Sequence, residues 1–264
     1  MQVEGKENSS REARLGRVAL VGCGFVADLY MRSLAAHPEI AVIAVHDHDP
    51  ARLAAFAAHW DVVVEPTLAA LLARLGPDDV VLNLTNPSSH YAVSRACLEA
   101  GHHVWSEKPL TLELSQARAL HDLAEARGLM LASAPSSVLG EAAQVLIGAV
   151  RRGLAGTPRL IYAEMDDGFI PQAPFAKWQS ESGAPWPHAD EFAVGCTLEH
   201  AGYVLSWLIA MFGSVTRVVS ASAEVIPDKP GGAHAPDVSV STLHFETGPM
   251  ARLTCSIVAS HDHR

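Results

Sequence analysis

The chain has 264 residues, of which 49% are hydrophobic and 18% are charged, and its formal net charge is −10 with a pI near 5.7. A chain of this length and composition buries a sizeable core and forms one large domain or two ordinary ones. No run of basic residues is present, so nucleic acid is not an expected partner, because neutralising phosphates needs clustered Lys and Arg. The apolar stretch 203–213 is too short to span a bilayer, and no membrane partner is predicted.

The beginning of the chain and its cysteines indicate a cytoplasmic protein. Residues 1–15 are polar and mixed in charge, without the apolar centre of a signal peptide, and we expect them to be a disordered leader. The four cysteines are widely spaced and form no C-x-x-C pair, so neither a disulfide framework nor a zinc knuckle is expected. The histidines match no recognised metal-ligand spacing, and no metal is predicted.

From Arg17 to about Ala134 the sequence alternates between strands and helices. Continuous apolar runs are separated by Ala- and Leu-rich stretches with helical spacing. The predicted strands are 17–21, 40–46, 61–64, 79–84, 102–105 and 129–133, and the predicted helices are 26–36, 50–59, 67–75, 90–100 and 112–127. This pattern is typical of a parallel sheet covered on both faces. The predicted fold class is therefore α/β, with a doubly wound Rossmann domain over residues 16–135.

The pattern changes after residue 135. We expect helices at 138–152 and 197–212, strands at 158–166, 215–225, 237–246 and 249–258, and a loop rich in Pro and Trp at 169–192. Runs of strands after helices favour a second, α+β domain over residues 136–264, with an open sheet that is mostly antiparallel or mixed.

A glycine-rich turn follows the first predicted strand, in the stretch VALVGCGFVADLYMRSL at 18–34. In a G-x-G-x-x-A loop, Gly22 permits the tight turn, Gly24 allows the backbone to approach a pyrophosphate, and Ala27 lets the helix lie close to the strand. Phe25 and Val26 open the helix, whose free N–H groups favour phosphate oxygens. The motif alone also fits a plain strand-to-helix turn.

An acidic residue supports the nucleotide interpretation. Asp47 ends the second predicted strand about 20 residues after the glycine loop, where a carboxylate accepts hydrogen bonds from ribose hydroxyls. Its charge would repel a 2′-phosphate, so NAD is favoured over NADP. A methyltransferase that binds S-adenosylmethionine has a similar glycine loop and acidic strand end, and it remains an alternative at this point.

Two polar segments follow the next strands of the sheet. The fourth predicted strand leads into Thr85, Asn86, Pro87 and the rest of TNPSSH, and the fifth leads into SEKP at 106–109. Both segments fall at the carboxyl edge of the sheet, beside the glycine loop. With an N-terminal GxGxxA, the T-x-P-x-x-H and EKP segments resemble the Gfo/Idh/MocA oxidoreductases, and the resemblance covers residues 16 to 258.

The resemblance implies a nicotinamide-dependent dehydrogenase with a Rossmann domain and a substrate-binding domain. Lys108 would then lie near both the nicotinamide ring and the substrate hydroxyl, where a cation favours a developing alkoxide. Glu107 would position Lys108 or touch the nicotinamide ribose, and His90 would contact the cofactor or only begin a helix. The expected substrate is a secondary alcohol of a sugar or cyclitol.

The chain departs from the family where many relatives carry D-x-G-x-H-x-x-D. Here the matching stretch places Glu199 at the first acidic position and Tyr203 at the histidine. A tyrosine whose pKa is lowered by a nearby lysine can exchange a proton. Tyr203 is thus one candidate for the proton acceptor, and His200 is the other.

Other substrate contacts are expected from the loop 169–192. Its Trp178 and His188 offer an aromatic face and a hydrogen-bonding group, which suit a sugar, and Glu199 and Tyr203 complete the predicted substrate site with Lys108. Relatives usually extend beyond the segment that ends here at Arg264, so the second domain is expected to be incomplete. If that domain is complete, a homo-oligomer is expected. A catalytically idle dinucleotide-binding or sensor protein is the remaining alternative.

Overall fold

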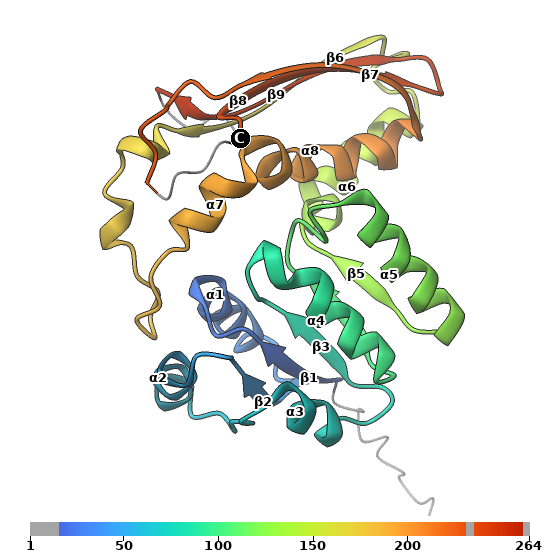
Figure 1. Cartoon of the computed structure of the whole chain (residues 1–264). Coiled ribbons are helices and arrows are strands. Elements are labelled where there is room, and N and C mark those ends of the chain that lie inside the picture. The colour runs from blue at the N-terminus through green and yellow to red at the C-terminus, as the bar shows by residue number, and fades with distance from the viewer. Residues whose placement is uncertain (1–15, 231–234, 261–264) are drawn as a thin grey trace, which may run out of the picture.

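The computed structural model describes residues 16–230 and 235–260, and it shows two layered halves (Figure 1). The predicted leader at 1–15 and the last residues, 261–264, lie outside the described residues. The first half contains a parallel sheet between helices, and the second contains an open sheet with helices on one face.

The sheet of the first half is parallel, as predicted, with the order β2-β1-β3-β4-β5. Its strands are β1 (Gly16–Val21), β2 (Ile40–His46), β3 (Val80–Asn83), β4 (His103–Ser106) and β5 (Leu131–Ser133). The predicted strand 61–64 is wrong as a full strand, because only Val64 forms an isolated parallel bridge, to Val45. Counted with this edge segment, the order becomes that of a dinucleotide-binding sheet, 3-2-1-4-5-6.

Helices cover both faces of this sheet (Figure 1). They are α1 (Phe25–Leu34), α2 (Pro50–Trp60), α3 (Leu68–Arg74), α4 (Pro87–Glu99) and α5 (Leu114–Arg127). The buried side chains of α1 and α2, including Ala27 and Phe56, form one core cluster, and those of α3, α4 and α5, including Leu71 and Leu120, form another. Two hydrophobic faces explain why the strands are continuously apolar.

The sheet of the second half is mixed, within the range predicted. Its order is β6-β9-β8-β7, where β6 pairs with β9 in parallel and the other pairs are antiparallel. The strands are β6 (Leu160–Gly168), β7 (Val215–Ala223), β8 (Val238–Phe245) and β9 (Met250–Ala259), and the helices are α6 (Glu141–Arg151), α7 (His188–Val194) and α8 (Cys196–Phe212).

Two predicted boundaries in this half need correction. The helix expected at 138–152 begins as a separate 3-10 turn, Ser137–Leu139, because the extended backbone of Gly140 interrupts it before α6. The segment 169–192 is not all loop. It contains two short 3-10 turns, and α7 begins at His188 with Asp190 and Glu191 in its first turn.

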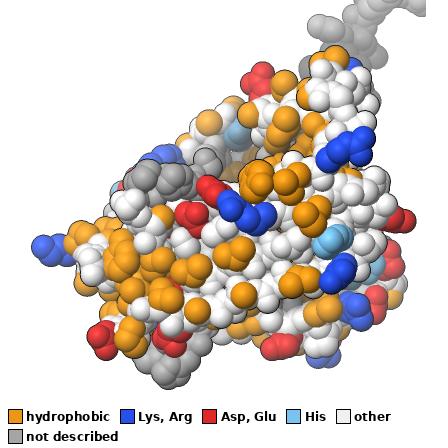
Figure 2. All heavy atoms as spheres, turned by 90° about the horizontal axis from the view of Figure 1, so that it is seen from above, with side chains coloured by type: hydrophobic (Ala, Val, Ile, Leu, Met, Phe, Trp, Pro, Cys, Tyr) orange, Lys and Arg blue, Asp and Glu red, His pale blue; other side chains and the backbone are white. Residues whose placement is uncertain are grey.

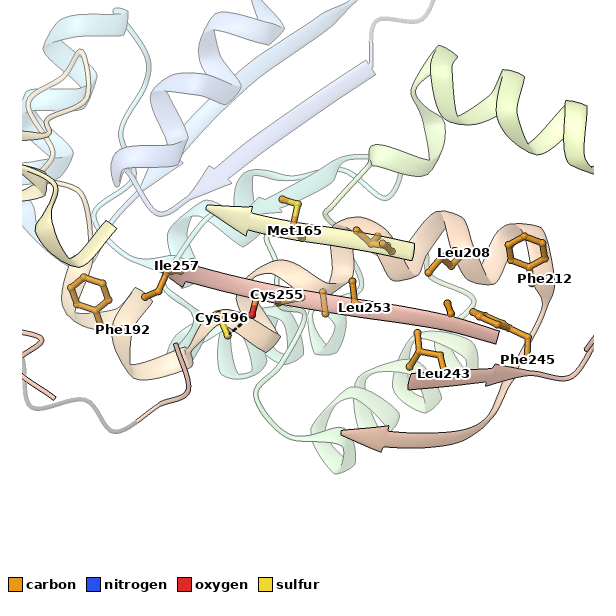
Figure 3. Close-up of a cluster of buried hydrophobic side chains, with 14 of the residues drawn as sticks. Met165, Phe192, Cys196, Leu208, Phe212, Leu243, Phe245, Leu253, Cys255 and Ile257 are labelled. Carbon is orange, nitrogen blue, oxygen red and sulfur yellow. Dashed lines mark hydrogen bonds between the residues drawn. The ribbon is translucent and has the colours of Figure 1, made fainter. Parts of the chain in front are cut away.

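Helix α8 packs its apolar side against the sheet (Figure 3). Leu208 and Phe212 of α8 meet Leu243 and Phe245 of β8, and the Cys196 thiol donates to the Cys255 carbonyl, 3.4 Å away. All four cysteines of the chain are free and buried. This packing fixes α8, and the polar side of the helix is left to face the first half of the chain.

The opposite face of the second sheet is exposed. Figure 2 shows hydrophobic side chains over the molecule from this side, and Tyr162, Val218 and Val219 are each more than half exposed. The predicted homo-oligomer remains a prediction.

Among the described residues no single helix is long and apolar enough to cross a membrane, although α7 and α8 pass that test together, with a 75° bend between them.

Candidate active site

The glycine loop joins β1 to α1 at the carboxyl edge of the first sheet. Gly22 has φ +99°, and a Cβ there would lie 2.6 Å from the Leu84 carbonyl oxygen, so only glycine fits. Gly24 differs, because a Cβ on it would meet nothing within 4 Å, and the residue borders two cavities. Ala27 is fully buried in the core between α1 and the sheet. The three positions therefore have the geometry that the motif requires.

Asp47 ends β2 beside this loop and is 5% exposed. Its Oδ2 accepts from the Cys23 N–H at 2.8 Å, and its Oδ1 accepts from the Asp49 N–H at 2.8 Å. Arg52 of α2 approaches the same carboxylate, with Nη1 3.7 Å from Oδ2. Backbone donors thus fix the carboxylate at the edge of a cavity of about 200 Å³. Gly22, Gly24, Asp47, Arg52, Thr85 and Asn86 are among its lining residues.

The loop after β3 is held by buried polar side chains. Asn83 accepts from the Thr85 hydroxyl at 2.7 Å and donates to the Ser94 hydroxyl at 2.9 Å. His90 is fully buried, with its ring nitrogens 2.6 Å from the Pro109 carbonyl oxygen and 2.7 Å from that of Thr85. It therefore ties the loop after β3 to the loop after β4, and it has no exposed surface that a ligand could contact in this structure.

The loop after β4 carries Glu107 and Lys108. Glu107 accepts from the Tyr30 hydroxyl at 2.8 Å and from the Lys108 N–H at 2.9 Å. Tyr30 in turn accepts from the Trp105 indole N–H at 2.9 Å. Sequence reasoning did not single out Tyr30, which lies 77 residues from Glu107 on α1. The sequence signal that could have identified Tyr30 is its position in the second turn of α1, shortly after the glycine loop.

Lys108 meets the second half of the chain through Glu199 of α8. Its Nζ donates to Glu199 Oε2, and the two side chains are 19% and 3% exposed. Burial by itself lowers the pKa of Lys108, but the carboxyl groups of Glu191 and Glu199 outweigh it and raise that pKa above its usual range. Lys108 is therefore a permanent ammonium. Two residues predicted for the substrate site are thus in direct contact.

Glu191 of α7 is a further acidic group that sequence reasoning missed. Burial raises its pKa, the Lys108 ammonium lowers it, and the neighbouring Glu199 carboxylate raises it, with a net value of about 8. Glu191 is therefore largely protonated at neutral pH. The available signal was its position four residues before Gly195, in the segment that leads directly into α8.

Tyr203 lies one turn beyond Glu199 on α8. The direction of its pKa shift corrects the prediction that a nearby lysine lowers this pKa. Burial raises the pKa of its phenol, Lys108 lowers it, and the carboxylates of Glu107, Glu199 and Glu191 raise it further. The net pKa is above the usual tyrosine value, because burial and three acidic neighbours outweigh one ammonium. Tyr203 is a protonated phenol in this site.

His200, the other candidate, turns toward the second sheet. Its Nε2 lies 3.1 Å from Oδ2 of Asp167 on β6, and its Nδ1 is buried without a hydrogen-bond partner among the described residues. Asp167 was not singled out from the sequence, because nothing local distinguishes it from the adjacent Asp166.

Two cavities meet at these side chains. The larger, of about 540 Å³, lies between α7, α8 and the second sheet, and the smaller, of about 240 Å³, lies over the glycine loop and the loops after β3 and β4. Four residues border both cavities: Lys108, Trp186, Glu191 and Tyr203. Phe25, Val26, Pro87 and Glu107 line only the smaller one. His200 and Glu199 line only the larger.

Two residues predicted to bind substrate do not line either cavity. Trp178 packs edge-on against Trp186 with ring centroids 5.2 Å apart, and His188 lies over Phe175 with centroids 5.1 Å apart. Both belong to an aromatic cluster that supports the cavity wall. Trp186 supplies the aromatic surface instead, because the loop folds around the buried Phe175.

The same loop is anchored to the first half. Asp28 of α1 accepts from the Trp60 indole at 2.5 Å and from the Ser182 N–H and hydroxyl at 3.0 and 2.8 Å. Burial raises the pKa of Asp28, but these donors and Ser180 lower it more, so the net pKa is lower than usual. Asn86 also donates to Asp190 at 2.5 Å. These contacts join the wall of the larger cavity to the dinucleotide-binding half.

Comparison with known families agrees with this arrangement. Residues 16–134 match the model of an oxidoreductase family with an NAD-binding Rossmann fold, and residues 144–264 match the model of the GFO/IDH/MocA C-terminal domain. The chain belongs to the Gfo/Idh/MocA oxidoreductase family. The methyltransferase alternative finds no support.

Relatives include sugar dehydrogenases. The chain is 32% identical over 157 residues to UDP-N-acetylglucosamine 3-dehydrogenase of Acidithiobacillus ferrooxidans, a match that covers 60% of this chain and 47% of that protein. It is 27% identical over 243 residues to D-apiose dehydrogenase of Paraburkholderia graminis, which covers 90% and 60% of the two chains. The match thus spans about half the length of the first relative and three-fifths of the length of the second.

A solved structure shares the fold. The WlbA dehydrogenase from Bordetella pertussis, in complex with NADH and UDP-GlcNAcA, superposes with a TM-score of 0.78 at 19% identity, over 95% of this chain and 69% of that one. At this identity the likeness concerns the fold alone.

Proposed function

We propose that the protein is an NAD(P)-dependent oxidoreductase that interconverts a secondary alcohol and a ketone on a sugar or cyclitol. The observation that carries the proposal is the meeting of two cavities at one ammonium, Lys108, and one phenol, Tyr203. The smaller cavity begins at the glycine loop, and the larger is walled by aromatic and polar groups, as a sugar site requires.

The residues of the first half fit a dinucleotide. The space in front of Gly24, which any side chain would fill, leaves room for phosphates at the N-terminus of α1, where no side chain caps the free N–H groups. Asp47 would accept from ribose hydroxyls, and its charge would favour NAD over NADP. Thr85, Asn86, Pro87 and Glu107 would line the nicotinamide end, with His90 as a positioning residue behind them. When bound, the nicotinamide C4 accepts or supplies the hydride.

The proton is handled by the chain's own groups. Lys108 stays charged and stabilises an alkoxide on the substrate oxygen. Tyr203, protonated in the free protein, donates its phenolic proton to that oxygen during ketone reduction and recovers it during alcohol oxidation. His200 is the alternative group, because it lines the same cavity and its Nδ1 has no hydrogen-bond partner among the described residues. Glu191 and Glu199 hold Lys108 in place and set the charge around it.

The test is a titration of the 264-residue chain with NADH and, in parallel, NADPH, followed by nicotinamide fluorescence, and then a turnover assay over a panel of polyols and ketoses. Tighter NADH binding with turnover is the expected result. Binding without turnover on any substrate would favour the idle sensor, and binding of neither nucleotide by a folded sample would refute the proposal.

A further inference from the structure

A hairpin of the second half reaches across to the dinucleotide-binding half. Residues 178–186 fold back on themselves, and the Trp186 N–H donates to the Trp178 carbonyl at 3.0 Å. The chain reverses at Gly183, whose φ of +89° is readily adopted by glycine. Figure 1 shows the segment before α7 extending toward α1 and α2. The two tryptophans thus form the base of the hairpin, and Gly183 lies at its tip.

The tip is latched to α1 by a buried carboxylate. Asp28 is 1% exposed, and its Oδ2 accepts from both the N–H and the hydroxyl of Ser182, at 3.0 and 2.8 Å. Glu181, the next residue of the tip, pairs with Arg32 of α1, and His59 of α2 lies 3.5 Å from the same carboxylate. Hydrogen bonds to an ionised group are stronger than neutral ones, so Asp28 is the main anchor of the hairpin.

The chain after the hairpin is attached to the first half a second time. Asn86, in the loop after β3, donates to Asp190 in the first turn of α7 at 2.5 Å. Trp186 and Pro187 lie between the two attachments in the sequence, and both line the smaller cavity. The glycine loop and the start of α1 line the same cavity from the first half. The segment 182–190 therefore bridges the smaller cavity and walls it on the side of the second half.

We propose that residues 178–190 form a strap over the nicotinamide end of the nucleotide site, and that Asp28 is the positioning residue that holds the strap shut. A dinucleotide with its phosphates at the glycine loop would extend its nicotinamide into the smaller cavity, against Trp186 and Pro187. Entry and departure of that end then require the hairpin tip to leave Asp28. This inference rests on the proposed function, because it describes how the same nucleotide site opens and closes.

A strap differs from a direct contact in its effect on binding rates. Neither Asp28 nor Ser182 lines the cavities around the glycine loop and Lys108, so both act on a nucleotide only through the strap. A weaker latch opens more often, and the association and dissociation rates should then rise by a similar factor, with little change in affinity. Loss of a direct contact would instead raise mainly the dissociation rate.

The test measures association and dissociation of NADH by stopped-flow nicotinamide fluorescence, for the wild type and for Ser182→Ala. The substitution removes one of the two Ser182 donors and leaves the hydrogen bond between Trp60 and Asp28 in place. Both rates are expected to rise about three- to tenfold, with the Kd within about threefold of the wild type. Ser115→Ala, at an exposed serine of α5, is the matched control and should change neither rate. Any result in which the two rates do not rise together would overturn the inference.

A second variant loosens the tip without touching the buried carboxylate. Glu181→Gln removes the ion pairs with Arg32 and His59 and leaves the hydrogen bonds to Asp28 in place. It should raise both rates by a smaller factor of about two, and this difference should vanish at high salt, where exposed ion pairs are screened. An effect on dissociation alone would count against the strap.

Hydrogen exchange tests the latch without any nucleotide. Peptides that cover residues 178–187 should exchange about three- to tenfold faster in Ser182→Ala than in the wild type, and those of α8 should not change. Equal exchange in the two proteins would overturn the inference even if NADH binds. If the wild type bound no NADH, the proposed function would be refuted, while faster exchange in the variant would still support the latch, so the two failures are distinguishable.

Discussion

The proton on Glu191 makes the stability of the protein depend on pH in a way that a single substitution should remove. In the folded protein the pKa of Glu191 is about 8, whereas an unfolded glutamate has a pKa of about 4.5. Between these values the folded state holds a proton that the unfolded state releases, so this group's contribution to stability is complete below about pH 4.5 and is lost as pH rises through 8.

The magnitude follows from the size of that window. One pKa unit corresponds to about 1.4 kcal/mol, and the partial exposure of Glu191 reduces the energy expected from the full shift, so we expect a loss of roughly 2–4 kcal/mol by about pH 9. Glu191→Gln keeps the size of the side chain and cannot ionise. The variant should match the wild type near pH 5 and exceed its free energy of unfolding by this amount near pH 9.

Urea denaturation across that pH range measures the difference, since the other titrating groups are common to both proteins. Glu99→Gln, at an exposed site on α4, is the matched control and should follow the wild-type profile. Parallel profiles for Glu191→Gln and the wild type would refute the reasoning, and so would a gap that widens toward acid.

Three further substitutions test the site and its anchoring. Lys108→Met should reduce kcat by about 10²–10⁴-fold and leave NADH affinity within a few fold; unchanged turnover would remove Lys108 from the mechanism. Asp47→Asn should weaken NADH more than NADPH in a fluorescence titration, whereas equal losses would mean that Asp47 does not contact the ribose. Asp28→Asn should cost about 1–3 kcal/mol of unfolding free energy near neutral pH. That cost should shrink as pH falls through the lowered pKa of Asp28, and a constant cost would contradict the assignment.

The dinucleotide half was predictable from sequence because its signals are local. The glycine spacing, the acidic end of β2 and the segment around Lys108 are each set within a few residues, and the parallel order of strands brings their carboxyl ends to one edge. The strand predicted at 61–64 was the exception. It lies at the edge of the sheet, where only Val64 finds a partner, and local apolarity does not reveal how many neighbours a strand has.

The charged cavity was not predictable in the same way, because its parts come from distant segments. Asp167 and Glu191 come together only when β6 and α7 meet α8. Nothing near Asp167 in the sequence marks it, and the position of Glu191 four residues before Gly195 is its one local signal. The raised pKa of Tyr203 depends on burial and on three carboxylates from different elements. The choice between Trp178 and Trp186 likewise depends on how one loop folds around Phe175.

The four side chains that border both cavities therefore have a double role. In the proposed mechanism Lys108 and Tyr203 act on the reacting oxygen, and Glu191 and Trp186 lie on the same boundary between the two cavities. A substitution of Glu191 is thus expected to change substrate preference and pH dependence together, because one carboxyl group contributes to both. Asp47 borders neither of these two cavities. A substitution of Asp47 is therefore expected to change nucleotide preference without changing substrate preference or the pH dependence of stability.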